Sequence, residues 1–356
     1  MTYLARTLVV SIGLIAFANL ACAAPEVVRD TDGHLITLVA GHASLKKWVL
    51  PDVPYPADNK PTAERIELGK KLFFDPRVSG DGNMSCATCH NPVRGFSDGL
   101  PTAKGVKSMV LGRATPTIWN AAYNTLQMWD GRKKSLEHQA LGPIQADVEM
   151  NADMTKLLGF LNESPGYKGL FEKAYPNLPI NDDTLGKAIA SFERTIISRN
   201  TPFDQWVAGK KGAMTADQVN GFKIFISSDK ANCAACHMGP NFTDNGFHNV
   251  GLQSFGAAEP DLGRFKERAL PVNRGAFKTP TLREAVSTGP YFHDGSARTL
   301  EEVVAFYAKA GEVRTNQSKT IKGFNLTDVE TRQLVSFLHA LTTQAPPAVT
   351  LPILPN

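Results

Sequence analysis

Two short cysteine motifs constrain the fold of this chain more than any other feature of its sequence. Residues 86–90 and 233–237 both have the pattern C-x-x-C-H and end in His90 and His237. In this pattern two thiols can add across the two vinyl groups of one haem, and the adjacent imidazole can reach the iron. The sequence therefore predicts two covalently bound c-type haems, attached through Cys86 and Cys89 and through Cys233 and Cys236.

Three other uses of closely spaced cysteines compete with this interpretation: a short disulfide, a thioredoxin-like redox pair and a zinc site. The chain has five cysteines, and Cys22 falls within a predicted signal segment. The two motifs therefore contain every cysteine of the expected mature chain. A repeated motif that uses all the thiols of an exported protein favours haem attachment over the alternatives.

The first 23 residues have the features of a secretory signal peptide. Arg6 precedes the predominantly apolar residues 8–20, and small residues around Cys22 offer a cleavage site. The apolar segment is too short to span a bilayer, and Asn19 argues against acylation of Cys22. We therefore expect export to the periplasm without stable membrane insertion.

Length and charge exclude further classes of protein. A chain of 356 residues is long enough for about two domains. Lysine and arginine number 38 against 34 acidic residues, which gives a formal net charge of +4. Because no run of basic residues stands out, nucleic acid is not an expected partner.

Sequence similarity between the two halves predicts a tandem arrangement. Residues 68–74 before the first motif match residues 220–226 before the second, and residues 96–98 match 242–244 after them. Two related haem modules explain this repetition.

The remaining sequence predicts a mostly α fold. Apolar residues recur at helical spacing after Thr184, and capping sequences begin at Thr215, Thr299 and Thr327. Pro202 disfavours helix at the residue before it, so a domain boundary is expected there. The expected divisions are a signal peptide over 1–23, haem domains over 24–200 and 201–335, and a strap over 336–356 that packs back on the N-terminal domain.

Further segments stand in a fixed order around the two motifs: Gly69-Lys70-Lys71-Leu72-Phe73-Phe74-Asp75-Pro76-Arg77, Trp129-Asp130-Gly131-Arg132, Gly142-Pro143-Ile144, Glu149-Met150, Pro202-Phe203-Asp204, Pro280-Thr281-Leu282-Arg283 and Pro290-Tyr291-Phe292-His293. With these segments, nearly the whole mature chain resembles the bacterial di-haem cytochrome c peroxidases together with MauG, a maturase that oxidises tryptophans in methylamine dehydrogenase. The resemblance implies two tandem cytochrome c-like haem domains. The N-terminal domain would handle peroxide and the C-terminal domain would transfer electrons.

The resemblance also implies roles for residues near the first haem. Glu149 is the expected acid and base that moves a proton between the two oxygens of hydrogen peroxide. Gln139 is expected to orient peroxide or water, and Pro143 to wall the pocket. Trp129 matches the tryptophan that lies between the two haems in the family.

The second haem is expected to have an oxygen ligand. The family's methionine ligand position aligns with Tyr307, where MauG-like members carry a tyrosine, and no methionine follows Met238. Helical spacing with Leu300 and Val304 places Tyr307 on an apolar stripe, which by itself favours a core tyrosine. With the resemblance added, Tyr307 is the expected ligand, and its phenolate would favour high iron valence.

The first haem is expected to be five-coordinate. Val106 falls at the position of a removable histidine ligand in reductively activated family members, and valine cannot ligate iron. This haem would react with peroxide while ferric and give a high-valent state shared with the second haem. Met109 is the alternative ligand if its loop shifts.

A calcium ion between the domains is common in the family and would use carbonyls matching Thr288 and Pro290. Ala114 stands at the aligned asparagine position and departs from that pattern.

Three functions remain open. A peroxidase would reduce hydrogen peroxide with electrons from a small cytochrome c or a cupredoxin. A MauG-like maturase would oxidise tryptophan or tyrosine side chains of a partner protein. A di-haem electron carrier that is not an enzyme would have two six-coordinate irons, which Val106 argues against.

Overall fold

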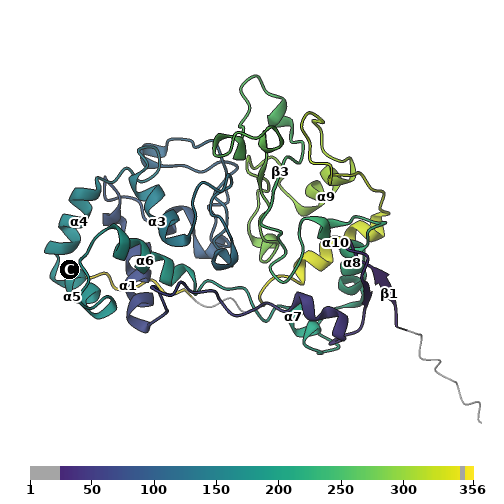
Figure 1. Cartoon of the computed structure of the whole chain (residues 1–356), viewed down its shortest axis with the longest axis horizontal. Helices are drawn as coiled ribbons and strands as arrows, with labels where there is room; N and C mark the ends of the chain where they lie inside the picture. The colour runs from purple at the N-terminus through teal and green to yellow at the C-terminus, as the bar shows by residue number, and fades with distance from the viewer. Residues whose placement is uncertain (1–24, 345–348) are drawn as a thin grey trace, which may run out of the picture.

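Short helices joined by irregular segments make up the computed structural model, which describes residues 25–344 and 349–356 (Figure 1). The predicted signal peptide over 1–23 lies outside the described residues. The helices are α1 (Ala63–Phe74), α2 (Cys86–Cys89), α3 (Leu136–Gln145), α4 (Met154–Glu163), α5 (Pro165–Ala174), α6 (Asp182–Glu193), α7 (Pro202–Val207), α8 (Ala216–Ile226), α9 (Leu300–Ala308) and α10 (Asp328–His339). The strands of the described ranges form two antiparallel pairs, β1 (Val27–Arg29) with β2 (Leu35–Thr37) and β3 (Phe247–His248) with β4 (Phe277–Lys278). The predicted mostly α fold is confirmed.

Side-chain caps begin the helices close to the predicted positions. Thr215 and Thr327 form the expected capping boxes of α8 and α10. Thr299 caps α9, but the carboxylate of Glu302 accepts from the amide of Arg298 instead. The helix expected to begin at Thr184 begins earlier, because Asn181 is its cap and Thr184 completes the capping box. In the described part of the chain no helix is long and apolar enough to cross a bilayer.

Two glycines at matching places in the two halves allow helices to cross closely. Gly69 of α1 lies against α6, where an added Cβ would stand 1.8 Å from the carbonyl oxygen of Ala188. Gly221 of α8 lies against α10, where an added Cβ would stand 2.0 Å from the carbonyl oxygen of Gln333. Both halves therefore use the same helix crossing, as a tandem duplication requires.

Each half has its own hydrophobic core. One core gathers buried side chains between residues 68 and 196, and the other gathers them from residues 28–48 and 203–341. Residues 28–48 fall in the range expected to belong to the first domain, yet they pack in the second core. Trp48 accounts for this, because its ring contacts Phe222 at 5.3 Å and Phe242 at 5.2 Å between ring centroids.

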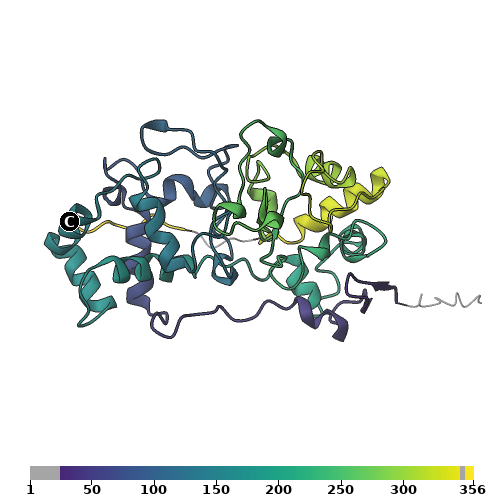
Figure 2. The same cartoon turned by 45° about the horizontal axis from the view of Figure 1, so that its top comes forward.

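The C-terminal residues return to the first half (Figures 1 and 2). Residues 336–339, expected to belong to the strap, are instead the last turn of α10, with Phe337 fully buried in the second core. Further on, the backbone oxygen of Ile353 accepts a hydrogen bond from Lys71 (2.6 Å), and that of Pro355 accepts one from Arg77 (2.8 Å).

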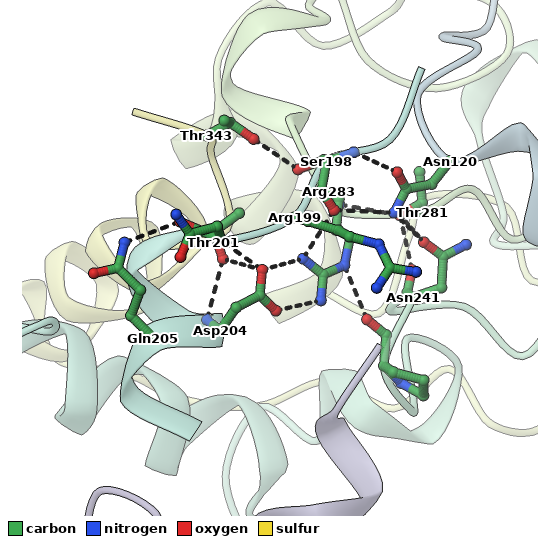
Figure 3. A network of polar contacts seen from close by, with 12 residues as sticks. Asn120, Ser198, Arg199, Thr201, Asp204, Gln205, Asn241, Thr281, Arg283 and Thr343 are labelled. Atoms are coloured by element: carbon green, nitrogen blue, oxygen red, sulfur yellow. Dashed lines mark hydrogen bonds and ion pairs between the residues drawn. The ribbon is translucent and has the colours of Figure 1, made fainter. Parts of the chain in front are cut away.

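A buried polar network joins the linker between the halves to both of them (Figure 3). Arg283, which is fully buried, donates two hydrogen bonds to the carboxylate of Asp204, at 2.9 and 2.7 Å. The side chain of Asn120, from the first half, accepts from the amide of Ser198 (2.6 Å) and donates to the side chain of Asn241 (3.0 Å). This network fixes where the second motif stands relative to the first half.

Candidate active site

Both motif histidines are held in the same way, by a backbone carbonyl a few residues further on. Nδ1 of His90 lies 3.2 Å from the carbonyl oxygen of Phe96, and Nδ1 of His237 lies 3.0 Å from that of Phe242. Donation from Nδ1 fixes the tautomer and leaves Nε2 with a free lone pair for a metal. Burial lowers the pKa of both imidazoles, which favours the neutral, ligating form.

The four motif cysteines are half-buried free thiols, so no disulfide joins either pair. Burial raises the pKa of Cys89 to about 11 and that of Cys233 to about 12. Cys89 and Cys233 are therefore neutral thiols and not the activated thiolate of a redox pair.

A cavity of about 590 Å³ adjoins the first motif, and its volume is in the usual range for cofactor sites. Its walls bring together the residues expected around the first haem, which are Cys86, Cys89, His90, Trp129, Gln139, Pro143 and Glu149. Thr288 and Pro290, the expected calcium ligands, also line it, from the second half. Met109 is 45% exposed and is not among the residues that line the cavity.

Glu149 is the carboxylate best suited to proton transfer in this cavity. It is half-buried, and burial raises its pKa, with Arg132 and Lys133 acting in the opposite direction. Its carbonyl oxygen accepts the amide of Val106 (2.8 Å), which holds that buried apolar residue beside the loop of Glu149. A carboxylate whose pKa is raised by burial is a stronger proton acceptor than an ordinary one.

Trp129 lies where the two halves meet. Its indole Nε1 donates to the carbonyl oxygen of Ala114 (2.9 Å), and its own carbonyl oxygen accepts from the amide of Lys278 in the second half (2.8 Å). The ring also lies 6.3 Å from the ring of His293, edge to face. Trp129 is therefore fixed by both halves, as a residue between two redox centres would be.

The structural repeat places Pro143 and Tyr307 at equivalent positions. Ser135 caps α3 and Thr299 caps α9, and Pro143 and Tyr307 follow their caps by the same number of residues. A proline side chain has no ligating atom, whereas a tyrosine side chain has one. The two halves therefore present different chemistry at the same place.

Tyr307 lies close to the second motif. Burial raises its pKa, and a negative charge on Cys236 or Cys233 would raise it further, since both lie near the phenol. Phe292 and Phe306 contact its ring, at centroid distances of 6.0 and 5.3 Å. Tyr307 thus stands in an apolar surrounding beside the cysteines of the second motif.

Two buried ionisable residues of the cavity wall, Glu193 and Lys278, were not expected from the sequence. Glu193 is 3% exposed, its Oε2 has no hydrogen-bond partner, and burial raises its pKa to about 8. It ends α6, where helical periodicity alone shows a polar residue and gives no sign of burial.

Replacing Glu193 by glutamine should change how stability depends on pH. The unfolded carboxyl titrates near its ordinary pKa of 4.5, so between that value and about 8 the unfolded chain releases a proton that the folded chain keeps. Stability of the natural protein therefore falls as pH rises through this window. We expect the free energy of unfolding of Glu193→Gln to equal that of the natural protein near pH 4.5. Near pH 8 it should exceed that of the natural protein by roughly 1–4 kcal/mol. Urea unfolding at both pH values measures this, and an identical pH dependence in the two proteins would refute it.

The residues present fit two c-type haems. The thiols of each motif are unpaired, each adjacent imidazole has its Nε2 free, and the first motif opens on a cavity of suitable size. His90 and His237 would hold the two irons on one side. Of the two residues at equivalent places of the repeat, Tyr307 has an oxygen that could ligate a metal and Pro143 has no ligating atom.

Comparison with known proteins agrees with this chemistry. The family model described as di-haem cytochrome c peroxidase matches residues 63–212, and the cytochrome c model matches residues 218–342. The chain is 43% identical to methylamine utilization protein MauG of Methylorubrum extorquens over 351 residues, which cover 96% of this chain and 98% of that protein. It is 36% identical to cytochrome c551 peroxidase of Nitrosomonas europaea over 306 residues, which cover 86% and 87%.

Among solved structures, a MauG-like protein associated with microbial copper homeostasis superposes with a TM-score of 0.78 at 29% identity, covering 86% of this chain and 97% of that one. The fold is therefore that of two tandem cytochrome c-like domains. The chain belongs to the family of di-haem cytochrome c peroxidases and MauG, which are oxidoreductases.

Proposed function

We propose that this protein is a periplasmic di-haem peroxidase whose first haem reacts with hydrogen peroxide in the ferric state. The observation that carries the proposal is the contrast between Pro143 and Tyr307 at equivalent places of the repeat. Val106, buried beside the loop of Glu149, supports it, because by the resemblance this position would carry the removable ligand and valine has no ligating atom. An iron with an open face can bind peroxide, whereas one with two ligands transfers electrons.

The haems would supply the site of peroxide binding and the store of oxidising equivalents, shared between them. Glu149 takes the proton from the inner oxygen of peroxide and returns it to the outer oxygen, which leaves as water. Gln139 holds peroxide by a hydrogen bond, and Pro143 excludes other groups from the same space. Trp129, fixed by both halves, lies on the route of electrons between them.

Tyr307 is the proposed oxygen ligand in the second half. Its position beside the second motif and the apolar rings around it support this role. A phenolate ligand stabilises the oxidised metal, so the second haem could hold an oxidising equivalent.

The two candidate enzymes differ in the source of the electrons that reduce the oxidised protein. A small cytochrome c or a cupredoxin would make the protein a peroxidase, and its similarity to cytochrome c551 peroxidase supports that role. Oxidation of tryptophan or tyrosine in a partner protein would make it a MauG-like maturase, and the higher identity to MauG supports this second candidate. A calcium ion at the carbonyls of Thr288 and Pro290 stays a prediction.

The test is to add hydrogen peroxide to the fully ferric, haem-loaded protein and follow its absorption spectrum. We expect a rapid spectral change without prior reduction, and a high-spin ferric signal in electron paramagnetic resonance before peroxide is added. We then compare how well three candidate electron donors restore the original ferric spectrum: reduced cytochrome c, a reduced cupredoxin and a tryptophan-bearing protein. A resting protein with two low-spin signals, or one that reacts only after partial reduction, would contradict the proposal.

A further inference from the structure

Lys278 is a buried cation without a matching anion. The residue is 8% exposed and lines the cavity of the first motif, although β4, which carries it, belongs to the second half. Its Nζ donates to the carbonyl oxygen of Thr279 (3.1 Å), and no carboxylate of the described residues lies within ion-pair distance. The carboxylate that acts on it from further away, Asp244, is already bound to His248 at 2.8 Å. A buried ammonium without a partner is costly, and burial accordingly lowers the pKa of Lys278 to about 8, so an anion bound in the cavity would stabilise its charged form.

The other cations of the cavity wall are already neutralised or exposed to solvent. Arg113 binds the carboxylates of Asp130 (2.7 Å) and Asp261 (2.6 Å). Arg132 also binds Asp130, at 2.8 Å. Lys104 and Lys266 are exposed. Among the cations on this wall, Lys278 therefore has the least compensated buried charge.

We propose that Lys278 is the counter-ion of a haem propionate, held at the boundary between the two halves. This inference rests on the proposed function only in that haem occupies the motifs. A porphyrin joined to Cys86 and Cys89 through its vinyl edge carries its two carboxylates on the opposite edge, away from the thiols. Cys86 and Cys89 line the cavity from the first half of the molecule, whereas Lys278 lines it from the second half. The haem of the second motif has the same carboxylates and is the other source of this anion.

Such an ion pair would link the haem edge to Trp129. The amide of Lys278 holds the carbonyl oxygen of Trp129, so one residue would fix the tryptophan through its backbone and the propionate through its side chain. The positive charge would also favour the reduced iron of the paired haem, because reduction adds a negative charge nearby. Lys278 is thus a positioning residue and not one that touches peroxide.

The test is the reduction potential of each haem in Lys278→Met, measured by spectroelectrochemistry with the two haems resolved by their high-spin and low-spin spectra. We expect two haems to be retained and the potential of one of them to fall, and the haem that shifts identifies which propionate is paired. Lys278→Arg keeps the charge and should restore the potential. Lys266→Met removes a cation from the same cavity wall, but an exposed one, and should leave both potentials unchanged.

The outcomes separate this inference from the proposed function. A protein that holds two haems and reacts with peroxide, but whose potentials are the same in Lys278→Met, would overturn the role of Lys278 alone. Natural protein without two haems would overturn the proposed function itself. If the methionine variant fails to mature, a crystal structure of the haem-loaded natural protein decides. A propionate oxygen within 4 Å of Nζ, the ion-pair distance, supports the pair, and solvent or protein oxygens alone around Nζ would refute it.

Discussion

Glu149→Gln is expected to slow the reaction of the ferric protein with hydrogen peroxide by a factor on the order of 10² to 10⁴. A glutamine has nearly the shape of glutamate but cannot accept the proton of peroxide, so binding space is kept and proton transfer is lost. The absorption spectrum before mixing should not change, because Glu149 does not touch either motif histidine in the proposed scheme. Stopped-flow mixing with peroxide under pseudo-first-order conditions measures the effect.

The pH profile of the same reaction distinguishes proton transfer from a packing role. Burial holds the pKa of Glu149 above its ordinary value of 4.5. The natural protein should therefore lose rate as pH falls through that raised pKa, because the carboxylate that accepts the proton disappears. In Glu149→Gln this dependence should vanish.

Asp147→Asn is the matched control for this prediction. Asp147 is an exposed carboxylate two positions away on the same loop. Its replacement removes one negative charge from the same region but leaves the cavity wall intact. We expect a rate within about twofold of the natural protein, since exposed charges act weakly through solvent. Equal slowing by both variants would show that general electrostatics and not proton transfer sets the rate.

The sequence predicts covalent haem attachment well, because the residues responsible are close neighbours in the chain. Cys86, Cys89 and His90 lie within five consecutive residues, so their relation to one haem follows from chain geometry alone. The mostly α fold and the tandem repeat are similarly encoded in caps and in the segments around Gly69 and Gly221. These features need no knowledge of how distant parts of the chain meet.

Burial and contacts between the halves were not predictable in this way. Glu193 and Lys278 are polar residues in ordinary local patterns, and only the meeting of helix, strand and cavity makes them buried. Residues 28–48 precede the first motif in the chain, yet Trp48 fills the second core. The equivalence of Pro143 and Tyr307 was not expected either, although a shared pattern leads into both helices: Asp-Gly at 130 and at 294, followed after three residues by Ser-Leu-Glu or Thr-Leu-Glu.

Asp204→Ala is expected to destabilise the protein by about 3–5 kcal/mol, the usual cost of removing one partner from a buried ion pair. The fully buried guanidinium of Arg283 would lose its carboxylate and keep only carbonyl acceptors, those of Pro240 at 2.9 Å and Ser198 at 3.4 Å. Arg283 holds the pKa of Asp204 below its ordinary value, although burial opposes this, so the pair is charged at neutral pH. Urea unfolding of the haem-loaded protein, followed by circular dichroism, measures the loss.

An ion pair with an exposed carboxylate supplies the control for this effect; its lysine also binds Asp58 at 2.8 Å. Asp183 binds Lys187 at 2.8 Å on the surface of α6, with its side chain 60% exposed. Asp183→Ala should therefore cost less than about 1 kcal/mol. Similar losses of stability in the two variants would show that burial does not increase the contribution of the Asp204 ion pair to stability.

The double variant Asp204→Ala with Arg283→Met distinguishes two causes of the lost stability. One is the buried guanidinium of Arg283 left without a carboxylate, and the other is the loss of the contact itself. If most of the cost in Asp204→Ala comes from an unpaired buried guanidinium, removing that charge should restore part of the stability, whereas additive losses would contradict this explanation.

The ion pair of Asp204 and Arg283 also joins the linker at Ser198 to the segment that follows the second motif. Asp204→Ala alone should therefore also make the position of the second motif relative to Trp129 less rigid. Slower electron transfer between the haems at a denaturant concentration where the variant is still folded would be the sign of that coupling.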